Sequence, residues 1–259
     1  MGTLVCFHAH PDDEAITTGG TIARAADEGH RVVIVMATNG DHGEVPDDLS
    51  PGETLVDRRR TEMEASARVL GAHRLVWLGY TDSGMTGWDQ NDHPGSFLQA
   101  PVDEAAERLA AVLRDERADV LTIYDWHGNY GHPDHIQVHH VGRRAAELAG
   151  TPSVYEATAN RDAMVRMMAD APEAPEFDPS QPMDDGNPFG MAEAELTHAV
   201  DVMPWVARKR ASIACHASQV SDSSFFLQMP DEVFAQAFGT EWYIKHGETP
   251  GPRAGWLFE

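Results

Sequence analysis

Two short segments of the chain carry the same His-Pro-Asp motif. The first is HAHPDDE at residues 8–14, and the second is YGHPDH at residues 130–135. Because proline fixes its own φ and restricts the residue before it, each motif predicts a rigid turn. Two histidines and one carboxylate would leave a zinc ion one open position for water, as in catalytic metal sites. The candidate donors are His10, Asp12, Asp13, His132, Asp134 and His135.

Alternating strands and helices are expected to position these motifs. Short apolar runs predict buried strands at residues 4–7, 32–36, 75–78, 120–123 and 153–155. Amphipathic stretches predict helices at residues 21–28, 54–70, 102–114 and 136–148. This pattern favours an α/β class, Rossmann-like fold, with a mostly parallel sheet covered by helices on both faces. Ligands of such sheets bind at the carboxyl ends of the strands, where both motifs fall.

The chain is expected to divide into a metal-binding core at residues 1–157 and a C-terminal portion at residues 158–259. The second part contains a proline-rich, acidic loop at residues 171–190, which is expected to cover the crevice. Beyond it, a smaller subdomain would close the fold and the pocket. Its expected elements are a strand at 197–202, a helix at 204–216, and further segments at 223–229, 232–238 and 242–245.

The composition excludes several classes of partner. Nineteen basic and forty-two acidic residues give a formal net charge of −23, which would repel nucleic acid and anionic membranes. No apolar run approaches the roughly 18 residues of a membrane span. The charged motif at residue 8 precedes any apolar stretch of useful length, so we expect no signal peptide and a cytoplasmic protein. The oligomeric state stays open, a homo-oligomer included.

On the two motifs, the chain resembles the LmbE-like, or PIG-L, deacetylase family. Supporting matches are TNGDHGE at 38–44, RTEMEASARVLG at 60–71 and ACHASQ at 214–219. Members of that family are zinc-dependent N-deacetylases of N-acetylglucosaminyl conjugates and related amides. One departure is Asp41, where the family more often has glutamate; we expect it to alter the surroundings of the metal more than the metal site itself.

The resemblance implies a role for each residue of the motifs. His10, Asp13 and His135 would bind Zn²⁺, for which Fe²⁺ or Co²⁺ could substitute. Asp12 would be the general base that activates the attacking water, because amide hydrolysis needs a base that is not itself a ligand. The residues implied for the oxyanion are His132 as an imidazolium, Asp134 as the group that orients it, and Tyr130 as a flexible phenol.

Three further residues are candidates for binding substrate. Arg59 could direct its planar guanidinium at sugar or inositol hydroxyls, or could be an ordinary surface arginine. Asp82 could accept hydrogen bonds from a hexose, or could belong to a simple turn. Trp88 could stack on a sugar face. The roles of His8, Glu14 and His216 stay open.

The predicted substrate is a small amino-sugar conjugate or a thiol conjugate. The YTDSGM loop at residues 80–85 looks like that of members acting in mycothiol metabolism, which deacetylate N-acetylglucosaminyl-inositol or cleave mycothiol S-conjugates. Deacetylation of a specialised-metabolite sugar is equally compatible. A non-haem Fe(II) oxygenase also uses two histidines and a carboxylate, but it has no use for the free Asp12 carboxylate. The third alternative is a non-catalytic binding module.

Two variants separate the predicted ligand from the predicted base. His135→Ala is expected to lose stoichiometric zinc, because it removes a ligand. Asp12→Ala is expected to keep the zinc and lose turnover. Metal analysis of the purified proteins checks both expectations. Full zinc in His135→Ala, or loss of zinc in Asp12→Ala, would show that the two assignments are wrong.

Overall fold

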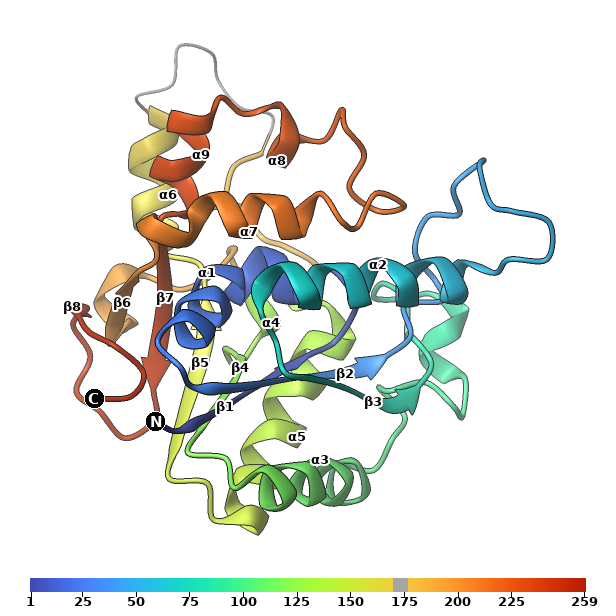
Figure 1. Cartoon of the computed structure of the whole chain (residues 1–259), viewed down its shortest axis with the longest axis horizontal. Helices are drawn as coiled ribbons and strands as arrows, with labels where there is room; N and C mark the ends of the chain where they lie inside the picture. The colour runs from blue at the N-terminus through green and yellow to red at the C-terminus, as the bar shows by residue number, and fades with distance from the viewer. Residues whose placement is uncertain (170–176) are drawn as a thin grey trace.

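The computed structural model of the chain describes residues 1–169 and 177–259 (Figure 1). Within these residues, eight strands form one sheet in the order β3-β2-β1-β4-β5-β7-β6-β8. Strands β1 to β5 pair in parallel, whereas β7 is antiparallel to both of its neighbours, β5 and β6. The strands are β1 Thr3–His8, β2 Arg31–Thr38, β3 Arg74–Tyr80, β4 Val120–Tyr124, β5 Ser153–Thr158, β6 His198–Asp201, β7 Thr240–Lys245 and β8 Arg253–Ala254.

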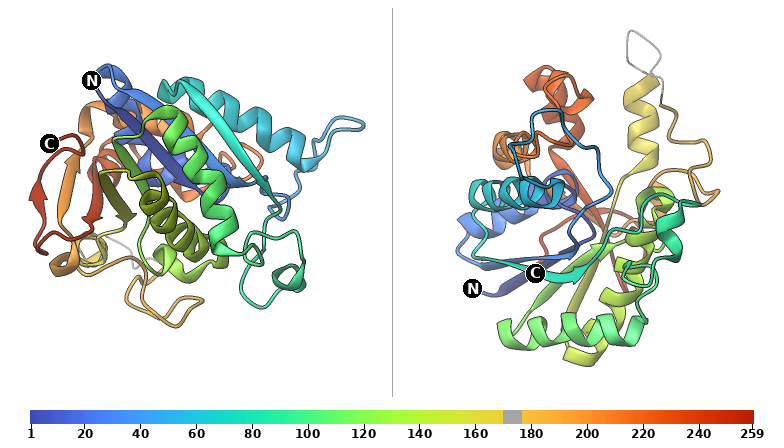
Figure 2. Two further views of the ribbon diagram at one scale, coloured as in Figure 1. Left: turned by 90° about the horizontal axis from the view of Figure 1, so that it is seen from below. Right: turned by 90° about the vertical axis from the view of Figure 1, so that its right-hand side faces the viewer.

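Helices cover both faces of the sheet, as the sequence predicts. Figures 1 and 2 show α3 and α5 on one face and α1, α2 and α7 on the other. Among the described residues, no helix has the length and apolarity needed to cross a bilayer. The helices are α1 Asp13–Asp27, α2 Leu55–Leu70, α3 Val102–Glu116, α4 Gly128–Gly131, α5 Pro133–Ala149, α6 Arg161–Ala169, α7 Val206–Ile213, α8 Phe225–Gln228 and α9 Asp231–Phe238.

The first strand shows why the parallel strands are apolar throughout. Successive side chains of a strand point to opposite faces of the sheet. Val5 and Phe7 pack in the cluster that contains the apolar side chains of α3 and α5. Leu4 and Cys6 pack in the cluster that contains those of α1 and α2. Since both faces are covered, no position in the middle of β1 is left for a polar side chain.

Helix α1 is longer than predicted. The sequence suggested a start near residue 21, after two glycines, but the helix begins at Asp13 and runs through both. The glycines serve close packing instead of a break: a Cβ on Gly20 would lie 2.5 Å from Cβ of Val202. The prediction of this helix start was therefore wrong, and the correct start places the helix directly after the first His-Pro-Asp motif.

A buried ion pair fastens the C-terminal part of the chain to α1. The Glu241 carboxylate on β7 accepts hydrogen bonds from the backbone amides of Gly20 and Thr21, both at 2.8 Å. Lys209 on α7 donates to the same carboxylate at 2.7 Å. Both charged side chains are almost fully buried. The C-terminal portion thus extends the same sheet and packs against its first helix.

The expected loop at residues 171–190 is described only in part. Residues 171–176 lie outside the described residues. Further along, Gly190 N–H donates to the carbonyl of Asn129 at 2.7 Å. Asp185 Oδ2 lies 3.2 Å from Nδ1 of His127. The described end of the loop therefore lies against the turn that follows β4. The sequence pattern did not indicate two elements of the C-terminal portion. Helix α6 comes before this loop, and strand β8 comes after β7.

Close packing of α5 on β4 yields a test of the fold. Gly142 of α5 faces Ile123, and a Cβ there would overlap the isoleucine side chain. We expect Gly142→Ala to lower the free energy of unfolding by about 1–3 kcal/mol, the usual cost of overpacking. Denaturant unfolding measures it. His140→Ala on the exposed side of the same helix is the control; equal stability of the two variants would contradict the close packing.

Candidate active site

The two His-Pro-Asp motifs meet because their strands are neighbours. Strands β1 and β4 pair in parallel, with Leu4 opposite Val120, so their carboxyl ends lie at the same edge. Each motif leads directly into a helix. Asp12 is the N-cap of α1, and His132 is the N-cap of α5 with Pro133 at its first position. Proline suits that position because its missing N–H would have no helical partner.

Three of the predicted metal donors converge on one point. Asp13 Oδ2 lies 3.3 Å from Nδ1 of His10 and 3.3 Å from Nε2 of His135. The opposite nitrogen of each ring has its own partner: His135 Nδ1 lies 3.3 Å from the carbonyl of Gly128, and His10 Nε2 lies 3.1 Å from Asp134 Oδ2. With the ring protons on those two nitrogens, the nitrogens that face Asp13 can offer lone pairs to a cation. Histidine ligands in metal sites are oriented in this way.

This donor set fits a divalent cation. His135 Nε2 is buried and has no hydrogen-bond partner among the described residues. Burial alone would lower the pKa of His10, but Asp82, Asp13 and Asp134 around it raise that pKa well above its ordinary value. The cluster therefore requires positive charge, which a metal cation supplies. Two other trios that share His10 with the predicted set have donor atoms that all lie within 4.8 Å of one another, a distance criterion that the described residues do not give for His10, Asp13 and His135: His10, His132 and His135, and His10, Asp82 and Asp134.

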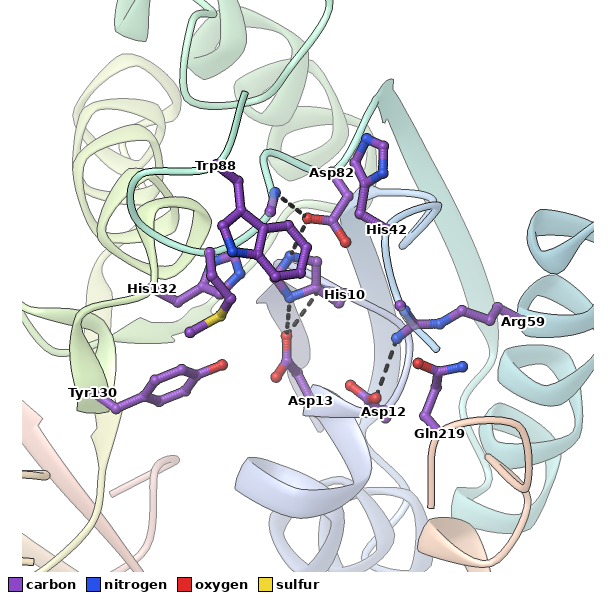
Figure 3. A pocket seen from close by; sticks show the side chains of 13 residues that line it. His10, Asp12, Asp13, His42, Arg59, Asp82, Trp88, Tyr130, His132 and Gln219 are labelled. Atoms are coloured by element: carbon purple, nitrogen blue, oxygen red, sulfur yellow. Dashed lines mark hydrogen bonds and ion pairs between the residues drawn. The ribbon is translucent and has the colours of Figure 1, made fainter. Parts of the chain in front are cut away.

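Asp12 is directed away from this donor cluster. Its Oδ2 accepts a hydrogen bond from Nη2 of Arg59 at 3.1 Å (Figure 3). Burial raises the pKa of Asp12 to about 6, with Asp13 adding to the effect and Arg59 opposing it. A carboxylate with a pKa near neutrality, beside a metal site but not within it, has the properties of a general base.

Arg59 has its hydrogen bonds within the protein. Besides Asp12, its guanidinium donates to the carbonyl of Pro11 and, at 2.9 Å, to the carbonyl of Gly40. It is a buried residue at the pocket wall, not the free surface arginine that was the alternative. Its predicted contact with substrate stays a prediction, whereas its contact with Asp12 is a feature that the sequence did not reveal.

His132 differs from its predicted state. Its Nδ1 accepts a hydrogen bond from the backbone N–H of Asp134 at 3.1 Å, so that nitrogen carries no proton. Burial, together with the neighbouring His10 and His135, lowers the pKa of His132. This hydrogen bond favours a neutral imidazole with its proton on Nε2 over the predicted imidazolium, and the charge of His132 during the reaction stays a prediction. A neutral imidazole N–H can still stabilise an oxyanion.

Asp134 is the residue predicted to orient His132. It orients His132 only through its backbone amide, because its carboxylate faces His10 and accepts hydrogen bonds from Ser83 N–H, at 2.9 Å, and from Ser83 Oγ. Ser83 was not among the predicted residues. Asp134 is completely buried. Ser83, on the loop after β3, holds the Asp134 carboxylate, and this carboxylate in turn fixes the orientation of His10, a predicted metal ligand.

The remaining predicted residues line a cavity of about 200 Å³. In Figure 3 the Tyr130 hydroxyl points toward Asp13, and the Trp88 ring lies on the viewer's side of the pocket, beside His132. Gly84, with φ +67°, leaves the space that the Trp88 ring occupies, since a Cβ would lie 2.7 Å from it. The lining comprises His10, Asp12, Asp13, His42, Gly43, Arg59, Asp82, Gly84, Met85, Trp88, Tyr130, His132 and Gln219.

Five lining residues were not singled out from the sequence: His42, Gly43, Gly84, Met85 and Gln219. Each lies in a segment that the resemblance had marked, so the sequence indicated the segment but did not assign a role to the residue. Asp41 also has a defined contact, because its Oδ1 accepts a hydrogen bond from the backbone amide of Asp82 at 2.9 Å. The aspartate at position 41, where the family more often has glutamate, therefore helps to hold the loop that carries Asp82.

Comparisons with known proteins agree with this geometry. The model of the family described as GlcNAc-PI de-N-acetylase, PIG-L, matches residues 5–146. A 1D-myo-inositol 2-acetamido-2-deoxy-alpha-D-glucopyranoside deacetylase of Streptomyces avermitilis is 38% identical, across 99% of this chain and 96% of that protein.

Two solved structures share the fold. N,N'-diacetylchitobiose deacetylase from Pyrococcus horikoshii has a TM-score of 0.57 at 24% identity, covering 94% of this chain and 83% of that one. The 4-carboxy-2-hydroxymuconate hydratase of Pseudomonas putida has a TM-score of 0.58 at 18% identity, covering 96% and 97%. Because a deacetylase and a hydratase share the fold, function must be argued from the site.

The contact between Arg59 and Asp12 predicts a change in pH dependence. Removing the guanidinium raises the pKa of Asp12, so a higher pH is needed to deprotonate the base. We expect Arg59→Gln to move the acid limb of the kcat/KM profile to higher pH. The adjacent Arg58, which pairs with Asp48 and Glu53 instead, gives the control variant Arg58→Gln. An acid limb at the wild-type position in Arg59→Gln would contradict the coupling.

Proposed function

Because the chain belongs to the PIG-L family of de-N-acetylases, we propose that it is a zinc-dependent hydrolase that removes the acetyl group from an N-acetylglucosaminyl conjugate. The observation that carries this proposal is the division of labour between two adjacent carboxylates. Asp13 faces His10 and His135, whereas Asp12 is turned to Arg59 with a pKa of about 6. A metal hydrolase requires both, and an oxygenase has no use for the second.

His10, Asp13 and His135 would hold the metal. Zinc, when bound, lowers the pKa of a water molecule to about 7 and polarises a carbonyl oxygen. Asp12 takes the proton of the attacking water, since it is the carboxylate that is not directed at the donors. Its pKa of about 6 leaves it mostly ionised at neutral pH yet basic enough to accept that proton.

Attack of water on the acetyl carbonyl carbon places a negative charge on the carbonyl oxygen. Two donors of the chain stabilise this oxyanion. His132 donates from Nε2, because its Nδ1 is already an acceptor. Tyr130, whose pKa is raised by burial, stays protonated and donates from its hydroxyl. Since neutral His132 brings no extra proton, the proton that Asp12 received returns to the leaving amine. We propose this path for the proton of the leaving amine, a choice that the sequence left open.

The substrate class follows from the relatives and the cavity. The Streptomyces avermitilis relative is named for an inositol glycoside of N-acetylglucosamine, and most of its length aligns with this chain. Trp88 at the cavity entrance, about half exposed, offers an apolar face to a sugar ring. Asp82 on the cavity wall is suited to accept from sugar hydroxyls. We therefore place an N-acetylglucosaminyl-inositol compound first among candidate substrates.

An amine-release assay tests the proposal. The panel contains the N-acetylglucosaminyl-inositol glycoside, other N-acetylglucosaminides and a mycothiol S-conjugate. We expect equimolar acetate and free amine from the first compound, loss of activity with a chelator, and recovery with added zinc. Asp12→Asn, of nearly equal shape, should retain zinc and lose turnover. A zinc-loaded protein that releases amine from no member of the panel would refute the proposal.

The oxyanion role of His132 can be measured separately. We expect His132→Ala to lower kcat by about 10²–10³-fold, the usual effect of removing one such donor, with little change in KM. Steady-state kinetics on the best panel substrate gives both constants. Because His132 is neutral here, His132→Gln, which keeps an N–H donor, should recover part of kcat. A His132→Ala variant with the wild-type kcat would rule out the role.

A further inference from the structure

Asp12 has an unusual backbone conformation. Its φ is +119°, in a region that side-chain-bearing residues rarely adopt. Such a conformation costs free energy and persists only where its surroundings hold it. In this chain both ends of the Pro11–Asp12 peptide are held. Arg59 donates to the Pro11 carbonyl, and the Asp12 N–H donates to Oε2 of Glu14 at 3.0 Å.

Glu14 is itself held from two other parts of the chain. Its Oε1 accepts a hydrogen bond from Nε2 of His216 at 2.7 Å. The same oxygen accepts a hydrogen bond from Oγ of Ser66 on α2. All three residues are fully buried. A carboxylate so placed can accept from all three donors at once, which a neutral side chain of the same shape cannot do.

The charges of this cluster are balanced within it. Burial would raise the pKa of Glu14, but His216 and Ser66 hold it below its ordinary value. His216 is in turn shifted toward its charged form by Glu14, against the effect of burial. Glu14 makes no hydrogen bond to His10, Asp13 or His135, the predicted metal ligands, whose partners lie elsewhere. Among the described residues, the one hydrogen bond between the Glu14 side chain and the motif goes to the backbone N–H of Asp12.

We propose that Glu14 and His216 are positioning residues that hold the Asp12 carboxylate in the orientation required for proton transfer. The inference rests on the proposed function, in which Asp12 is the base. His216 contributes by fixing Glu14, and Glu14 contributes by fixing the N–H of Asp12. The same arrangement explains why the motif continues with an acid after its two aspartates, although that acid faces away from the cavity.

Two substitutions at His216 separate positioning from general support of the fold. His216→Leu removes the donor to Glu14, and His216→Gln retains an N–H donor. We expect His216→Leu to lower kcat about 10–100-fold, the usual effect of losing a group that orients a functional side chain, with KM unchanged. His216→Gln should recover most of kcat. Zinc stoichiometry and the visible spectrum of the Co(II)-loaded protein should match the wild type in both.

A control and a double-mutant cycle make the test specific. Ile213→Val, on buried Ile213 of α7, perturbs the same region without touching Glu14 and should leave kcat unchanged. On the residual turnover of Asp12→Asn, measured at high enzyme concentration, His216→Leu should cause no further loss, because the two residues act as one unit. If His216→Leu fails to fold, Ser66→Ala removes the other donor to Glu14 with a smaller change in volume.

Three kinetic outcomes would overturn the inference: a wild-type kcat in His216→Leu, a loss that persists undiminished in the Asp12→Asn background, or an equal loss in Ile213→Val. A crystal structure of Glu14→Ala gives a readout that does not need turnover. The φ of Asp12 should relax to a negative value. If it relaxes but the wild type cleaves no panel substrate, the proposed function fails, whereas the positioning of Asp12 by Glu14 stands. If φ stays near +119°, the positioning role of Glu14 is wrong.

Discussion

Strands β1 and β4 lie side by side and parallel, and their carboxyl ends bring two distant His-Pro-Asp turns to one place. The order of the sheet reverses between these strands, since β2 and β3 continue on one side and β5 on the other. At such a point the connections diverge and leave a crevice above the sheet. Each turn leads directly into a helix, so the position of each turn is fixed by the strand before it and the helix after it. The convergence of His10, Asp13 and His135 follows from this adjacency.

Burial of so many ionisable groups in one place requires that each has a partner. Asp134 is paired with His10 and Ser83, Asp12 with Arg59, and Glu14 with His216. An unpaired buried charge would cost several kcal/mol, so these pairings are conditions for folding as well as for chemistry. The partners come from α2, from the loop after β3 and from the segment after α7. The site therefore depends on the whole chain and not only on its two motifs.

The features predictable from the sequence were those set by short-range patterns. Apolar runs located β1 to β5 because strands buried on both faces contain little else, and the paired motifs located the donors. The start of α1 was missed because Gly19 and Gly20 resemble a helix break, whereas Gly19 faces Lys209 and Gly20 makes room for Val202, contacts that no local pattern contains. The orientation of Asp134 and the bonds of Arg59 were missed for the same reason. Alternation of helix and strand also cannot show that β7 enters beside β5 in antiparallel sense.

The ion pair between Lys209 and Glu241 has a consequence for the order of folding during synthesis. The hydrogen bond from Gly20 to Glu241 joins residues 221 positions apart. The glycine face of α1 therefore has no cover until β7 and α7 have emerged from the ribosome. A nascent chain that holds only the first five strands contains both histidine motifs, yet it lacks the residues that cover the glycine face of the helix beginning at Asp13. Assembly of the catalytic pocket must wait for nearly the full length of the polypeptide, and contacts of such long range make folding slow.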